Sequence, residues 1–279
     1  MMYFLVTSMP KSGSTWLQRI FAAHPDMHCR VEDQFTKFWA DFKLLVSNYN
    51  TLIERRDRER DHQGVDRLNA ADTIELFYSM VRITLEKAPK GSTWSGVKDL
   101  SLSAKGFLTM FPEDSRVVTI IRDPRDVAVS AWAHGTRIKP QGDTRDQNPQ
   151  TSFVVETASY WKKQLQLAEA AQNDFPGRAT YVRYEDLSSD FEDTIARLFA
   201  FFDVARDLET IDTIREATAF QTLSGGRQPG EEDLTSFFRS GRWGAWRDTL
   251  TVPQIWEVDQ ICGEDLAAYG YPRDENDLL

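Results

Sequence analysis

Short apolar runs alternate with amphipathic stretches along this chain. Phe4–Val6 and Val117–Ile121 are too short for buried helices, and the second is a continuous β-branched run typical of a central parallel strand. Trp94–Val97 is similarly strand-like, and apolar residues recur at helical spacing over 16–21. This alternation predicts an α/β fold, a single domain over 1–279 with a mainly parallel central sheet flanked by helices.

The regions between the predicted strands differ in character. Residues 36–90 carry apolar side chains at helical spacing, separated by the charged stretch Glu54–Asp61, which is typical of a solvated helix face with ion pairs. Residues 135–152 and 223–234 are rich in glycine, proline and polar residues without periodicity, so we expect loops there. No internal repeat or change in composition indicates a second domain.

The segment Pro10–Trp16 joins the first predicted strand to the first predicted helix. Such a turn places the unpaired amides of the first helical turn beside a ligand, an arrangement that binds phosphate groups. Lys11 adds a positive charge, and Gly13 permits a close approach of the backbone. Hydroxyl donors come from Ser12, Ser14 and Thr15. The alternative interpretation is a plain strand-to-helix turn with serine caps.

A second candidate site follows the run at 117–121. Arg122 stands at its carboxyl end, where ligands gather in open α/β sheets. Asp123 is placed to cap the next helix, and Ser130 falls about two turns into that helix. Arg122 therefore either binds a ligand or forms an ordinary ion pair with Asp123 or Asp126.

Three segments in the second half of the chain complete the pattern. Ser236–Arg247 combines arginines with an aromatic pair, and Tyr181–Leu187 and Thr218–Phe220 are shorter aromatic segments. In order and content, the segments described above resemble the sulfotransferases that use 3′-phosphoadenosine 5′-phosphosulfate (PAPS). The resemblance extends over residues 4–250 and implies a P-loop-like domain that uses PAPS as co-substrate and releases adenosine 3′,5′-bisphosphate (PAP).

The resemblance also implies which residues bind PAPS. The first loop would hold the 5′-phosphosulfate, the arginines with Ser130 the 3′-phosphate, and the aromatic residues the adenine. These cofactor residues are Lys11, Ser12, Gly13, Ser14, Thr15, Trp16, Arg122, Ser130, Tyr184, Thr218, Phe220, Phe237, Phe238, Arg239, Ser240 and Gly241. The sequence departs from the family pattern at Ser240, where a lysine is usual, and at Ala245, where an acid is usual. Arg242 is a candidate to supply the missing charge.

The catalytic residues follow from the same resemblance. Lys11 would neutralise the bridging oxygen, with Ser130 holding Lys11 back until the acceptor arrives and Lys98 steadying the sulfuryl oxygens. A general base must also lie within hydrogen-bond reach of the acceptor. Asp99 stands where the small-molecule enzymes have a histidine. Glu32 ends a His-Pro segment that resembles the tyrosylprotein and carbohydrate sulfotransferases. We favour Glu32 over Asp99, with His28 as a third candidate.

Composition narrows the partners. The formal net charge of −10 argues against nucleic acid as a partner, because proteins that bind nucleic acid present basic faces. The acceptor is expected to be a small molecule, a sugar or a peptide that carries a hydroxyl or an amine. Two separated cysteines and four scattered histidines predict free thiols and no metal site. No signal peptide or membrane anchor is apparent, so we expect a cytoplasmic protein. We expect it to be a monomer or a homodimer. Residues 36–90 are expected to form a helical insertion on the acceptor side of the domain.

Two other functions remain open from the sequence. A P-loop kinase acting on a small hydroxyl compound would share the fold, but its motif G-x-x-x-x-G-K-[ST] places the lysine after the last glycine. Here Lys11 precedes the loop's only glycine. A non-catalytic protein that binds adenosine bisphosphate would fit if neither Glu32 nor Asp99 faced Lys11.

Overall fold

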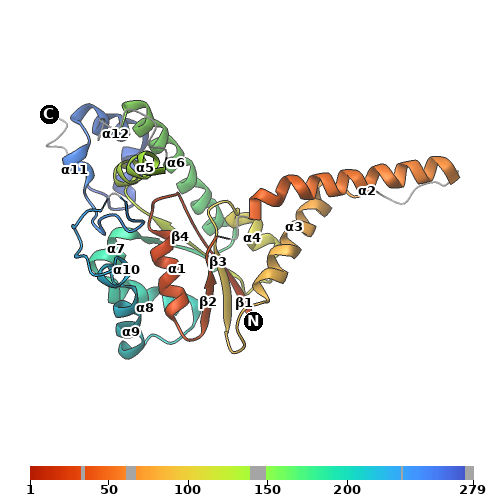
Figure 1. Ribbon diagram of the computed structural model, residues 1–279, viewed down its shortest axis with the longest axis horizontal. Helices are drawn as coiled ribbons and strands as arrows, with labels where there is room; N and C mark the ends of the chain where they lie inside the picture. The colour runs from red at the N-terminus through yellow and green to blue at the C-terminus, as the bar shows by residue number, and fades with distance from the viewer. Residues whose placement is uncertain (33–34, 61–66, 139–148, 234, 274–279) are drawn as a thin grey trace.

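A five-stranded, entirely parallel sheet forms the centre of the computed structural model, which describes residues 1–32, 35–60, 67–138, 149–233 and 235–273 (Figure 1). The strands lie in the order β2-β3-β1-β4-β5. They are β1 (Met2–Ser8), β2 (Met27–Arg30), β3 (Trp94–Lys98), β4 (Arg116–Ile121) and β5 (Ala179–Arg183). The α/β fold and the three strands expected from their apolar runs are confirmed.

Strand register brings the chemically interesting loops to one edge of the sheet. Val6 of β1 pairs with Lys98 of β3, and Ser8 pairs with Ile120 of β4. Parallel strands in this register end side by side. The loops that begin at Met9, Asp99 and Arg122 therefore lie together at the carboxyl edge.

Helices cover both faces of the sheet (Figure 1). They are α1 (Ser14–Ala23), α2 (Trp39–Arg60), α3 (Ala70–Leu85), α4 (Ala104–Met110), α5 (Pro124–Ile138), α6 (Thr151–Asp174), α7 (Tyr184–Ser189), α8 (Phe191–Phe202), α9 (Leu208–Thr218), α10 (Phe220–Leu223), α11 (Trp246–Thr249) and α12 (Val252–Ala268). A 3₁₀ helix, Phe35–Phe38, precedes α2. None of these helices, within the described chain, is long and apolar enough to cross a membrane.

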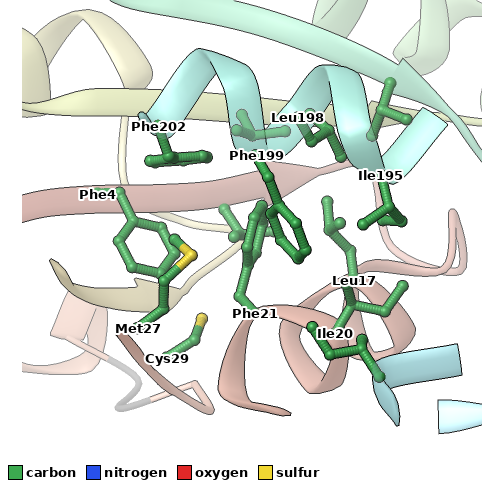
Figure 2. Close-up of a cluster of buried hydrophobic side chains, with 14 of the residues drawn as sticks. Phe4, Leu17, Ile20, Phe21, Met27, Cys29, Ile195, Leu198, Phe199 and Phe202 are labelled. Carbon is green, nitrogen blue, oxygen red and sulfur yellow. The ribbon is translucent and has the colours of Figure 1, made fainter. Parts of the chain in front are cut away.

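Side chains of β1 point alternately to the two faces of the sheet and contribute to a hydrophobic core on each face. Phe4 and Val6 pack with α1 and α8, and Figure 2 shows Phe4 beside Phe21 and Phe202. Tyr3 and Leu5 point to the opposite face and pack with α3 and α4. Successive strand residues face opposite sides, so a fully apolar strand requires helices on both. A third core joins α5, α6 and α12.

The predicted loops are only partly loops. α5 runs to Ile138 and α6 begins at Thr151, so residues 135–138 and 151–152 are helical, while 139–148 lie outside the described residues. Buried Val129 and Val154 anchor the two helices in the third core, and this packing extends them beyond the apolar pattern. Leu223 ends α10, so the second predicted loop begins one residue later than expected. The described residues from there to α11 contain neither helix nor strand, so the loop also extends well past residue 234.

Candidate active site

The turn between β1 and α1 is tightly curled at the carboxyl edge. Lys11 (φ 71°) and Gly13 (φ 92°) both adopt the left-handed conformation, which favours glycine at position 13. A Cβ at Gly13 would lie 2.4 Å from the Tyr184 ring, so there is no room for a side chain at this position. Gly13 caps α1 without a side-chain hydrogen bond, and the first turn contains no acidic residue. This helix end is therefore suited to an anion.

Arg122 connects this turn to two other segments. Its guanidinium donates to the carbonyls of Lys11 (3.2 Å) and Arg242 (3.1 Å) and lies 4.5 Å from the centre of the Tyr184 ring. A guanidinium nitrogen of Arg122 lies 3.7 Å from the Asp126 Oδ2 and forms an ion pair with it. The ligand and ion-pair interpretations of Arg122 are thus not exclusive, because the ion pair holds a guanidinium that also lines the cleft.

Asp126 also fixes the start of the third segment. Its carboxylate accepts from the backbone N–H groups of Gly244 (2.6 Å) and Trp246 (3.1 Å). Burial raises the pKa of Asp126, and the charge of Arg122 and the Gly244 hydrogen bond oppose that rise. The α5 terminus and the loop before α11 are therefore held together beneath the cleft.

The loop before α11 is organised by Arg227. Its guanidinium donates to the carbonyls of Glu231 (3.0 Å), Arg239 (2.8 Å) and Phe238 (2.5 Å), and to the Ser236 hydroxyl (2.8 Å). The rigid fork of donors on an arginine suits this role. Nothing in the sequence singled out Arg227, because carbonyl partners leave no pattern of residue types.

A cleft of about 670 Å³ lies between these loops. Its described lining includes six cationic side chains and a single carboxylate, Glu32. The cationic residues are Lys11, Lys98, Arg122, Arg215, Arg239 and Arg242. Arg215, Arg239 and Arg242 each also pair with a carboxylate outside the lining. The surface that faces the cleft is nevertheless mainly cationic, which favours an anion in a chain of net charge −10.

The aromatic end of the cleft is fastened to α9. The Trp16 indole N–H donates to the Thr218 carbonyl (2.9 Å), and Tyr184 packs edge-on against Trp16. Phe220 closes on Gly241, where a Cβ would lie 2.4 Å from the ring. Flat, apolar walls of this kind accept an aromatic base.

At the acceptor end, Lys98 and Glu32 form an ion pair. The Lys98 Nζ lies 2.7 Å from the Glu32 Oε1, with Lys98 buried and Glu32 partly exposed to the cleft. The predicted alternative, Asp99, is absent from the lining. It is buried, and its Oδ1 accepts from the Ser101 backbone N–H (2.8 Å), the Ser101 hydroxyl (2.5 Å) and the Leu102 N–H (3.2 Å). His28, the third candidate, also does not line the cleft.

The structure thus brings together nearly all the residues expected from the sequence. Of the predicted cofactor residues, fifteen line the cleft, and Ser12 does not. Ser12 is buried below the turn, and its hydroxyl has no hydrogen-bond partner among the described residues. Arg215 lines the cleft but was not predicted, because Asp212 three residues earlier on α9 makes it look like one half of a surface ion pair. In the structure it also pairs with Glu192 on α8.

Metal-ligating groups and thiols offer no further candidate site in the described part of the chain. No group of three or more metal-ligating side chains occurs there. Cys29 and Cys262 are buried and unbonded to each other, and burial raises the pKa of both thiols.

A parallel α/β sheet with a bare helix terminus, a lysine-bearing turn and a cationic cleft at its carboxyl edge defines a protein built to bind a nucleotide-like polyanion. Residues 3–270 match the sulfotransferase domain family. The chain therefore belongs to the PAPS-dependent sulfotransferases, as the motifs predicted.

Individual relatives agree with this assignment. Cytosolic sulfotransferase 12 of Arabidopsis thaliana is 26% identical over 286 residues, which cover 95% of this chain and 77% of that protein. Among solved structures, mouse sulfotransferase SULT7A1 complexed with PAP is 17% identical with a TM-score of 0.57, over 99% of this chain and 84% of that one. Retinol dehydratase with androsterone and inactive cofactor PAP is 19% identical with a TM-score of 0.58, over 98% and 83%.

Proposed function

We propose that the cleft binds PAPS with its 5′-phosphosulfate against the turn at 11–16 and its 3′-phosphate between Arg122, Ser130 and Arg239. The observation that carries this assignment is the ratio of six cationic side chains to one carboxylate in the described lining. The adenine would lie against the aromatic end beside Trp16 and Phe220. A solved relative contains PAP, the product of the same reaction.

The chain's own residues then serve one in-line displacement. The acceptor oxygen or nitrogen bonds to sulfur while the bond from sulfur to the bridging oxygen breaks, and the departing phosphate keeps the electron pair. Lys11 would balance the charge that grows on that oxygen, and Lys98 would orient the sulfuryl oxygens. Ser130 lines the same cleft and would hold Lys11 back until an acceptor is present.

Glu32 would accept the proton that the acceptor loses. Its carboxylate is exposed to the cleft, where a substrate can reach it, and its ion pair with Lys98 fixes its direction. The Oδ1 of Asp99 accepts three hydrogen bonds in a buried turn and Asp99 does not line the cleft, which supports the choice of Glu32.

The chemical class of the acceptor and the cellular location of the protein are also proposed here. The apolar and aromatic lining fits a small molecule that carries a hydroxyl or an amine, and androsterone occupies a structural relative. Residues 36–90 would contribute to the acceptor side. The first curated relative is named a cytosolic enzyme, which supports a cytoplasmic location.

Lys11→Ala tests the assignment of the turn. We expect turnover of PAPS to fall by at least 10²-fold, because charge stabilisation at the leaving oxygen is lost. PAP binding should weaken far less, since Arg122 and Arg239 remain. Turnover equal to that of the wild type would show that Lys11 does not face the leaving group.

A further inference from the structure

A second cavity, of about 400 Å³, lies behind the turn between β1 and α1. The carboxyl ends of β1 and β4 form its floor, and the start of α4 and one side of α6 form its walls. Lys11 and Gly13 of the turn line the cleft described above. Met9 and Ser12, from the same turn, line the second cavity instead. The turn is therefore a common wall, which a ligand in either cavity would contact.

Two threonines on neighbouring strands lie at the floor of the second cavity. Thr7 of β1 and Thr119 of β4 are paired in the sheet register, and each is only partly buried. They face the same side of the sheet as Leu5 and Val117, which are buried in the core there. A hydroxyl at such a position is favourable only with a hydrogen-bond partner, and a ligand in the cavity can supply one.

The walls of the second cavity are mainly apolar and almost uncharged. Tyr160, Gln164 and Leu167 line it from one side of α6, at helical spacing. Among the described lining residues the only charged side chain is Lys105, whose Nζ lies 2.7 Å from the Asp174 Oδ2. Apolar and aromatic walls with a few polar groups are typical of a site for a small neutral molecule.

Ser12 connects the second cavity to the turn. It is 1% exposed, and its hydroxyl has no hydrogen-bond partner among the residues that the structure describes. The preceding residue, Lys11, has a φ of 71°, a left-handed conformation that is strained for a residue other than glycine. A ligand that accepts a hydrogen bond from Ser12 would stabilise the turn in the conformation that presents Lys11 to the cleft.

We propose that the second cavity binds a small neutral aromatic molecule with one hydrogen-bonding group, and that this molecule strengthens the binding of PAP in the cleft. Its polar group would lie against the two threonines and Ser12, and its ring against Tyr160. The strengthening of PAP binding rests on the proposed function of the cleft, whereas the second site itself does not. By linkage, PAP strengthens the binding of the molecule by the same factor.

NMR of isotope-labelled threonine methyl groups tests the location, with benzamide as the probe because it is neutral and carries neither a hydroxyl nor an amine. Thr7→Val and Thr119→Val each remove one signal and so assign it. With PAP bound, both signals should shift as benzamide is added to about 20 mM, with a Kd of about 1 mM or lower. The Thr180 signal, from a strand position that lines neither cavity, should not shift. Unmoved Thr7 and Thr119 signals, or shifts confined to Thr218 in the cleft, would overturn the proposal.

The double variant Thr7→Val with Thr119→Val tests the chemistry of the floor. Valine keeps the shape and suits a buried parallel strand, so the variant should fold while benzamide binding weakens about 10-fold with the loss of two hydrogen bonds. Saturation-transfer NMR of benzamide measures its binding, and thermal unfolding verifies the fold. Thr180→Val is the matched control and should bind benzamide like the wild type. Undiminished binding of benzamide by the double variant would overturn the proposal.

Calorimetric titration with PAP, with and without saturating benzamide, tests the coupling between the two cavities. We expect benzamide to lower the Kd for PAP about 5-fold in the wild type. An unchanged or higher Kd would show that the turn does not couple the two cavities and would overturn that part of the proposal. If PAP did not bind at all, the proposed function would fail, while the methyl shifts in the free protein would still decide whether the second site exists.

Discussion

Glu32 and Lys98 meet across the acceptor end of the cleft, while Asp99 turns away from it. The reason lies in β3, because successive residues of a strand face opposite sides. Once Lys98 points to the cleft, its neighbour must point elsewhere, and the Ser101 and Leu102 donors receive it. Asp99 is therefore buried away from the cleft in which a substrate would lie.

Replacing each carboxylate by its amide separates the two candidates. Glu32→Gln should lower kcat by about 10² to 10⁴, the usual contribution of a general base. Asp99→Asn keeps an oxygen acceptor for the turn and should change kcat by no more than a few-fold. Steady-state turnover of PAPS with an excess of acceptor measures both. A near-normal Glu32→Gln together with an inactive Asp99→Asn would reverse the assignment.

At the scale of elements, the cleft depends on loops that are held by backbone contacts. The strands, the turn at 10–16 and the arginine that follows β4 could be predicted, because each leaves a pattern of residue types. The positions of Arg227 and Asp126 could not, since both act on carbonyl or N–H groups that every residue shares. Likewise, the ends of α5 and α6 depend on tertiary packing in the third core rather than on local pattern.

Arg227 should position the loop that carries Phe238 and Arg239 without touching the reaction. Both Arg227→Ala and Arg227→Lys should raise the Kd for PAP about 10-fold, because lysine cannot reproduce the fork of hydrogen bonds. The kcat at saturating PAPS should stay within about 2-fold, since the reacting groups lie on other loops. Arg206→Lys, at an exposed position, is the matched control. Full rescue of binding by lysine would show that only the charge matters.

At the scale of the whole molecule, a chain of net charge −10 contains a mainly cationic cleft, and the buried carboxyl of Glu185 follows Tyr184 of its lining. Glu185 accepts from the Asp123 backbone N–H (3.1 Å) and the Tyr271 hydroxyl (3.2 Å). Burial raises its pKa from 4.5 to about 7, with the Asp123 N–H opposing the rise. Folding therefore favours the protonated form. The stability this provides is complete below about pH 4.5 and is lost as the pH rises through about 7.

Glu185→Gln should remove this pH dependence. At pH 8 the variant should gain on the order of 2 kcal/mol in free energy of unfolding over the wild type, and at pH 5 much less. The amide oxygen still accepts from Asp123. Urea denaturation at both pH values measures the difference, with Glu216→Gln as the exposed control. An equal effect at both pH values would mean that Glu185 does not titrate between them.

Calorimetric titration decides whether the cleft binds an adenosine bisphosphate. The folded chain is titrated with PAP and, in parallel, with ATP and magnesium. We predict tight, one-to-one binding of PAP that Arg122→Ala weakens by at least 10-fold, because that guanidinium joins all three loops at the cleft. We predict no comparable binding of ATP. Binding of ATP and magnesium without binding of PAP would show that the cleft is not a PAPS site.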